Sequence, residues 1–223
     1  MKTIITRISI VAFLTCAPLL APRARSAPPM EEVALPDTRA GRCAAPALAF
    51  VRNCEALIFD IRYNGGASPV MIQLISSYLF EKPTHHNGFY DRAGEKADET
   101  WTYEDIPGRR FGRDVPVYVL ISNRTFSAAE EFAYNLKHLK RATIIEERSG
   151  GGAHPVKMIP VNDRFIMSVP YKRAFNPITK WNWEGTGVIP DIKTSAEDAL
   201  DAARKAALDR IGEVRRARKS EAR

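Results

Sequence analysis

Short apolar runs alternate with helical patterns through the middle of the chain. Residues 56–61 and 115–122 are apolar almost throughout and have the length of strands that are buried on both faces. Each run is followed by a turn and then by a helical pattern, at 68–80 and 127–139. The repeated order of strand, turn and helix predicts an α/β chain with crossover helices and a sheet that is at least partly parallel.

The flanking segments fit the same architecture. We expect a helix at 44–52, loops and hairpins over 83–114, a strand at 142–146, and a hairpin that pairs 157–161 with 164–169. Residues 194–197 read as a capping box that opens a last helix. The apolar face of that helix is predicted to carry Leu200, Ala203, Ala207, Leu208 and Ile211.

The two ends of the chain have a different composition. Lys2 and Arg7 precede an apolar run at residues 8–20, and Ser26 with Ala27 offers a small-residue cleavage site, as in a secretory signal peptide. The run is shorter than the ~20 residues that span a bilayer. We therefore expect a signal peptide at 1–27, no membrane span, and export to the periplasm or the outside. A linker at 28–43, one domain at 44–211 and a basic tail at 212–223 complete the predicted organisation.

Charge and cysteine content exclude several classes of protein. The formal net charge of +7 falls to +3 without residues 1–27, which hold four basic and no acidic side chains. No basic stripe alternates with aromatic residues, so we expect no nucleic-acid partner.

A helix between Cys43 and Cys54 would separate them by ~16 Å, so free thiols are expected. No metal-binding or phosphate-binding spacing appears, so neither metal nor cofactor is expected.

Two turns between a strand and a helix carry candidate chemistry. Ser127 opens a helix, where unpaired N–H groups and the helix dipole favour an alkoxide, and the N–H of Ala128 could donate to an oxyanion. Asn64, Gly65 and Gly66 form the other turn, in which glycine lets backbone N–H groups approach a ligand. If the turns face each other, one supplies a nucleophile and the other an oxyanion donor. The alternatives are a plain N-cap and a plain tight turn.

Three further side chains could assist. Glu184 stands between tryptophans and glycines. It could be a carboxylate held near a base, or a solvated acid in a loop. Trp181 and Trp183 would share a face if this segment is extended. His154 follows three glycines, as the base or as a residue that orients the loop. Glu130 lies one turn along the helix from Ser127, where it could position a base or cap the helix. The remaining histidines are expected at the surface or in structural positions.

Four segments in order resemble the motifs of peptidase family S41, the tail-specific or C-terminal processing proteases. They are residues 57–66, 125–130, 149–154 and 182–192, and the last two resemble the interphotoreceptor retinoid-binding protein-like branch. The resemblance implies a crotonase/ClpP-like core of strand–strand–helix units and a peptide or protein substrate. It also implies Ser127 as nucleophile, with an oxyanion hole of Ala128 and Gly65 or Gly66.

The chain departs from that family at the general base. By alignment, the lysine of the tail-specific members falls at Gly152, and no lysine stands between Arg141 and His154. Tricorn-like relatives use a histidine before the strand at 57–62 and a glutamate well after the serine. Glu184 fits the position of the glutamate. No histidine precedes that strand, because the first one in the chain is His85. Three hypotheses follow: a secreted serine peptidase acting through an acyl-enzyme, a non-catalytic module that binds a peptide or apolar ligand, and a shortened chain with an incomplete site. The oligomeric state stays open.

Overall fold

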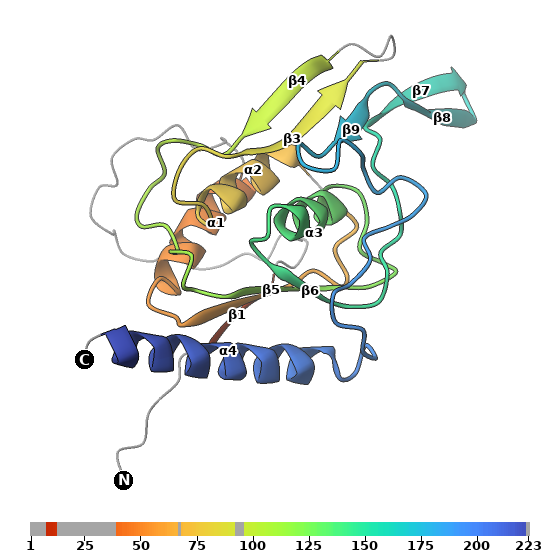
Figure 1. Cartoon of the computed structure of the whole chain (residues 1–223). Helices are drawn as coiled ribbons and strands as arrows, with labels where there is room; N and C mark the ends of the chain where they lie inside the picture. The colour runs from red at the N-terminus through yellow and green to blue at the C-terminus, as the bar shows by residue number, and fades with distance from the viewer. Residues whose placement is uncertain (1–7, 13–38, 67, 92–95, 222–223) are drawn as a thin grey trace, which may run out of the picture.

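A four-stranded parallel sheet forms the centre of the molecule (Figure 1). The computed structural model describes residues 8–12, 39–66, 68–91 and 96–221. The strands run in the order β1-β2-β5-β6, with bounds Ile8–Ala12, Ala56–Asp60, Val117–Ile121 and Thr143–Glu146. All three neighbouring pairs are parallel, which confirms the predicted α/β class.

Helices cover both faces of this sheet (Figure 1). Three of them lie on one face and α4 crosses the other; their bounds are Arg39–Phe50 (α1), Pro69–Ser77 (α2), Ala128–His138 (α3) and Ala199–Glu221 (α4). Leu57 and Phe59 of β2 pack in the core beneath α1 to α3, whereas Ile58 between them packs with Ala203 of α4. A strand with a core on each side has to be apolar wherever it is buried, which explains the apolar run at 56–59; Asp60, at the end of the strand, is only partly buried.

The ends of the chain differ from the expected organisation. Residues 8–12, inside the predicted signal peptide, form the edge strand β1 beside β2, and the rest of 1–27 lies outside the described residues. The signal peptide itself stays a prediction. Helix α1 begins at Arg39, so the last part of the predicted linker is helical.

Helix α4 also starts and ends differently from the prediction. It begins at Ala199 instead of at the capping box, and Ser195 exchanges hydrogen bonds with Asp198 just before it. Leu208 is exposed, because the buried stripe of this helix repeats through Ala199, Ala203, Ala207 and Ile211. Most of the predicted basic tail continues the helix.

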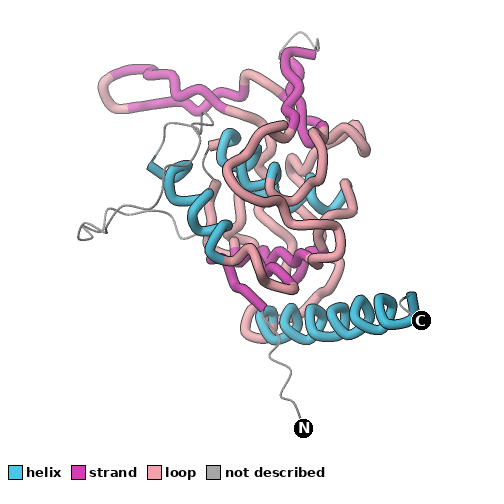
Figure 2. Tube along the Cα trace, turned by 90° about the vertical axis from the view of Figure 1, so that its left-hand side faces the viewer, coloured by secondary structure: helices cyan, strands magenta, loops and turns pink. Residues whose placement is uncertain are grey.

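Antiparallel strands lie beyond the central sheet. A three-stranded sheet has the order β4-β3-β9, and a separate hairpin pairs β7 with β8 and projects away from the body in both views (Figures 1 and 2). Their bounds are His85–Tyr90 (β3), Lys96–Trp101 (β4), Val156–Asn162 (β7), Phe165–Pro170 (β8) and Arg173–Phe175 (β9). The hairpin predicted at 157–169 is thereby confirmed.

Three further observations concern the cysteines, the helix lengths and the metal-ligating side chains of the described residues. Cys43 is exposed and Cys54 is buried, and the two do not form a disulfide with each other, as expected. No helix among the described residues is long and apolar enough to cross a membrane. Within the same residues, no group of three or more His, Cys, Asp or Glu side chains is arranged to hold a metal ion.

Candidate active site

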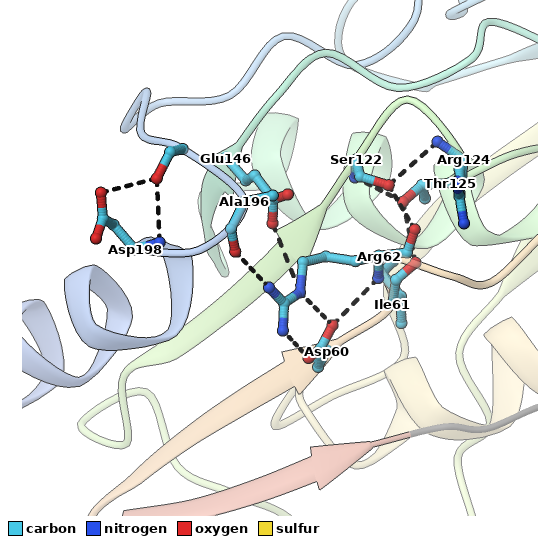
Figure 3. A network of polar contacts seen from close by, with 10 residues as sticks. Asp60, Ile61, Arg62, Ser122, Arg124, Thr125, Glu146, Ala196 and Asp198 are labelled. Atoms are coloured by element: carbon cyan, nitrogen blue, oxygen red, sulfur yellow. Dashed lines mark hydrogen bonds and ion pairs between the residues drawn. The ribbon is translucent and has the colours of Figure 1, made fainter.

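The two turns singled out in the sequence are joined at the carboxyl ends of β2 and β5 (Figure 3). The Thr125 hydroxyl donates to the Ile61 carbonyl at 3.0 Å, and the Ser122 hydroxyl donates to the Arg62 carbonyl at 2.5 Å. A third hydrogen bond runs from the N–H of Phe126 to the carbonyl of Asn64, at 3.1 Å. These bonds fix the segment that leads to Ser127 against the segment that leads to the glycines.

Arg62 ties this junction to the rest of the sheet (Figure 3). Its guanidinium pairs with Asp60 at 2.6 Å and with Glu146 at 3.6 Å, and it donates to the carbonyl of Ala196 at 2.7 Å. Burial raises the pKa of Glu146 to about 7, although the positive charge of Arg62 opposes that shift. The guanidinium therefore links the ends of β2 and β6 to the chain that enters α4.

Ser127 has the backbone conformation of a strained turn. Its φ of 55° and ψ of −125° are rarely adopted by residues other than glycine, and its side chain is exposed at the start of α3. A Cβ atom added to Gly66 would lie 2.7 Å from the Ser127 Cβ and 3.2 Å from the Ala128 nitrogen. Only glycine fits so close, so the diglycine turn and the serine turn are in direct contact, as the sequence predicted.

The amide groups around Ser127 are not equally available. The N–H of Gly66 donates to the Asn64 side chain at 2.9 Å. Ala128 is the first residue of α3, and a helix leaves its first N–H groups without an internal acceptor. A Cβ added to Gly65 would meet nothing within 4 Å, so this residue borders open space. The Gly66 N–H is therefore already engaged, whereas Ala128 at the helix start and the exposed Gly65 remain candidates to offer a hydrogen bond.

Glu130 holds the serine turn against the triple-glycine loop. Its side chain is fully buried and accepts four hydrogen bonds. The donors are the N–H of Ser127 at 2.9 Å, the hydroxyl of Ser149 at 2.5 Å, and the N–H groups of Gly151 at 2.6 Å and Gly152 at 2.8 Å. Of the two expectations for Glu130, the structure shows the helix cap, and none of the four donors that it meets in the described part of the chain is a histidine or a lysine.

Gly152, where the resemblance led us to look for a lysine, is closed to a larger side chain. A Cβ added to Gly152 would lie 2.1 Å from the nearest atom of the Phe126 ring. The Gly152 N–H is fixed by Glu130 as well, so the loop cannot shift freely away from the ring. A lysine at this position would therefore have to displace Phe126 before it could approach Ser127.

Glu184 and His154 lie side by side, where the 182–187 segment meets the end of the glycine loop. The Glu184 carboxylate accepts hydrogen bonds from the N–H groups of Ala153 at 2.7 Å and His154 at 3.1 Å. It lies 3.8 Å from the His154 Nδ1 atom. The other ring nitrogen, Nε2, is buried and has no hydrogen-bond partner among the described residues. The structure therefore brings the carboxylate of the 182–187 segment to the end of the glycine loop, where His154 lies.

The two tryptophans do not share a face, contrary to the prediction. Trp183 is 1% exposed and donates its ring N–H to the Gly152 carbonyl at 3.1 Å, whereas Trp181 is 59% exposed. The segment is not extended, because Asn176 accepts hydrogen bonds that close a turn and Lys180 has a φ of 58°. Trp183 therefore supports the glycine loop from inside.

Sequence reasoning missed a group of buried polar side chains on the other side of α3. Burial raises the pKa of Glu131 to about 8, and its Oε1 atom has no hydrogen-bond partner among the described residues. Asn87 lies near it, and Asn135, one turn further along α3, accepts a hydrogen bond from Asn176 at 2.7 Å. His86 is buried too, which lowers its pKa to about 4 and corrects the expected surface position. No periodic pattern in 83–90 marked this region as buried.

Comparisons with known proteins agree with this fold. The chain belongs to peptidase family S41, whose sequence profile matches residues 35–194. Mature CPAF in complex with lactacystin has a TM-score of 0.62 at 18% identity, over 76% of this chain and 46% of that one. The photosystem II D1 C-terminal processing protease has a TM-score of 0.58 at 23% identity, over 71% and 40%.

A further similar structure is a putative S41 protease from Bacteroides fragilis. It has a TM-score of 0.59 at 20% identity, over 74% of this chain and 45% of that one. This chain therefore spans less than half the length of each of the three proteins. At these identities the likeness establishes the shared fold.

Proposed function

We propose that this protein is a serine-type peptidase that cleaves peptide bonds through an acyl-enzyme on Ser127. One observation carries the proposal: the strained Ser127 is exposed at the tip of α3 and lies in direct contact with the diglycine turn. Strain of this kind persists where the surrounding structure enforces it and is frequent at active sites. Membership of family S41 makes peptides the class of substrate.

The proposed reaction is acyl transfer in two steps. The Ser127 hydroxyl loses its proton to a base and attacks the substrate carbonyl, and the N–H groups of Ala128 and Gly65 stabilise the oxyanion. The C–N bond then breaks, and the amine leaves with the proton that the base returns. Water attacks the ester in the same way, releases the acid and restores the serine.

We assign His154 as the base and Glu184 as the carboxylate that orients it. The Nε2 atom of His154 makes no hydrogen bond within the described residues, to Ser127 or to any other group, so the assignment requires the ring and the hydroxyl to approach each other when substrate binds. The Nδ1 atom lies 3.8 Å from Glu184. A carboxylate at that nitrogen would hold the ring and stabilise the imidazolium formed during attack. Glu130 would position the turn without exchanging protons.

Several finer expectations belong to the same proposal. The retinoid-binding-protein-like branch, the crotonase/ClpP-like class of the core, and export by residues 1–27 all follow from the sequence motifs. Export would place the enzyme in the periplasm or outside the cell.

A second candidate function is a non-catalytic module that binds a peptide or an apolar ligand. The closed position at Gly152 favours it, because Phe126 fills the space where tail-specific relatives have a lysine. The module would keep the two turns as a binding surface and lack a competent base.

A serine-reactive fluorophosphonate probe separates the two functions. We expect labelling of the wild type and its complete loss in Ser127→Ala, with Ser168→Ala, on the exposed hairpin, as the matched control. We expect His154→Gln to slow labelling ~100-fold or more, the usual contribution of a general base. A folded wild type that stays unlabelled would favour the binding module, and a His154→Gln variant that labels at the wild-type rate would remove His154 from the mechanism.

A further inference from the structure

The hairpin of β7 and β8 exposes an unusual amount of apolar surface. Its large apolar side chains are 43–65% exposed, and these are Val156, Met158, Ile159, Val161, Phe165, Ile166 and Met167. An isolated two-stranded hairpin is at best marginally stable in water. A contiguous apolar patch of this kind marks a surface that another molecule covers.

Both faces of the hairpin are apolar. Ile159 pairs with Met167, and the next pair along, Pro160 with Ile166, points to the opposite face. A hairpin that packed on the body of its own chain would need one apolar face only. This one projects away from the body in both views (Figures 1 and 2).

The two edges of the hairpin differ in chemistry. Strand β7 carries Lys157 and Pro160, and lysine and proline are residues that discourage pairing at a strand edge. Strand β8 has neither a charge nor a proline between Phe165 and Val169. Within the described part of the chain this sheet has two strands, so the outer edge of β8 is unpaired. The edge open to a further strand is therefore that of β8.

We propose that β8 pairs with β8 of a second copy of this chain, antiparallel and about a two-fold axis. The pairing is self-complementary, because the same uncharged strand meets itself, as a two-fold interface requires. It converts two marginal hairpins into one four-stranded sheet, in which the edge N–H and C=O groups of both β8 strands find partners. A lipid surface would cover the apolar side chains but would leave those backbone groups unpaired.

Cysteine scanning of β8 tests this arrangement. In a background with Cys16→Ser and Cys43→Ser, each residue from 165 to 169 is replaced by cysteine in turn. About a two-fold axis one residue faces its own copy, with Cα atoms ~4.5–5.5 Å apart, inside the ~7 Å limit for a disulfide. We expect disulfide-linked dimers to peak at one position and to fall on both sides, and light scattering to give a dimer mass for the wild type.

Met158→Cys on β7 is the matched control for Ile166→Cys. Both native side chains are 63% exposed, so equal chance collisions would link them equally. We expect the control to remain monomeric on a non-reducing gel. A wild type that is monomeric at every concentration, or links that form equally on β7 and β8, would overturn the proposal. A monomer that floats with phosphatidylglycerol and phosphatidylethanolamine vesicles would assign the hairpin to lipid instead.

Discussion

Two neighbouring acids on helix α3 stand in opposite environments. Glu130 and Glu131 are both buried, but Glu130 faces the glycine loop and accepts four hydrogen bonds there. Glu131 lies on the side of β3, where one of its oxygens has no partner among the described residues and burial raises its pKa to about 8. Both carboxylates are buried, so the feature that distinguishes them is the number of hydrogen-bond donors that each one meets among the described residues.

The two sides of helix α3 therefore differ in hydrogen bonding. The side of Glu130 is tied to other segments, whereas polar atoms on the side of Glu131 lack partners among the described residues. On the side of Glu130, one carboxylate links Ser127 to Ser149 and to the glycine loop, so the candidate nucleophile is held by several segments at once. On the side of Glu131, polar groups are buried without enough partners, which is costly for stability. The predictions below test each side in turn.

The largest loss of stability is expected when the Glu130 carboxylate is removed. Glu130→Ala would leave the buried Ser149 hydroxyl and three partly buried backbone N–H groups without their acceptor. Unsatisfied buried donors cost ~1–3 kcal/mol each before relaxation, so we expect a loss of ~3–5 kcal/mol in the free energy of unfolding. Urea denaturation measures it, and fluorophosphonate labelling of Ser127 should fall in the fraction that remains folded.

Glu130→Gln provides the matched variant, because it keeps the shape but replaces one acceptor oxygen by an NH₂ group. Its stability should lie between those of the wild type and Glu130→Ala. A Glu130→Ala protein as stable as the wild type, with unchanged labelling, would show that the four hydrogen bonds do not hold the nucleophile turn.

The second effect concerns Glu131 and depends on pH. Its folded pKa of about 8 lies above the ~4.3 of an unfolded glutamate. The folded state therefore retains a proton that the unfolded state loses, so this group lowers stability progressively as pH rises from about 4.3 to about 8. Glu131→Gln removes that ionisation and should gain ~4 kcal/mol over the wild type at pH 9 relative to pH 5, because about three pH units separate pH 5 from the folded pKa and each is worth ~1.4 kcal/mol.

Thermal unfolding across this pH range is the measurement, with the exposed Glu197→Gln as control. The advantage of Glu131→Gln should grow with pH up to about 8 and level off above it. An advantage that is equal at pH 5 and pH 9 would show that Glu131 does not titrate in this range, and that its buried site is better satisfied than the structure indicates.

The contrast between the two acids also shows where sequence reasoning ends. The strands β2 and β5 were predictable, because burial on both faces requires an unbroken apolar run, and the turns at Ser127 and Gly66 follow directly from those strands. The spacing from Ser127 marked Glu130 as a possible helix cap. Its other three donors and the burial of Glu131 could not be predicted, since they come from segments that are not adjacent in the sequence. The filling of the lysine position by Phe126 was equally hidden, because it depends on how closely the glycine loop packs.

The smallest loss of stability is expected when the Ser149 hydroxyl, one of the four donors to Glu130, is removed. The buried Ser149 hydroxyl donates to Glu130 at 2.5 Å and accepts the N–H of Val188 at 2.6 Å. Ser149→Ala removes both bonds but leaves the carboxylate with its three backbone donors, so we expect a loss of ~1–2 kcal/mol in urea denaturation and near-normal labelling of Ser127. Ser168→Ala, on the exposed hairpin, should change neither. If Ser149→Ala were as damaging as Glu130→Ala, the side chain of Ser149, and not the backbone of the glycine loop, would be what keeps the carboxylate in place.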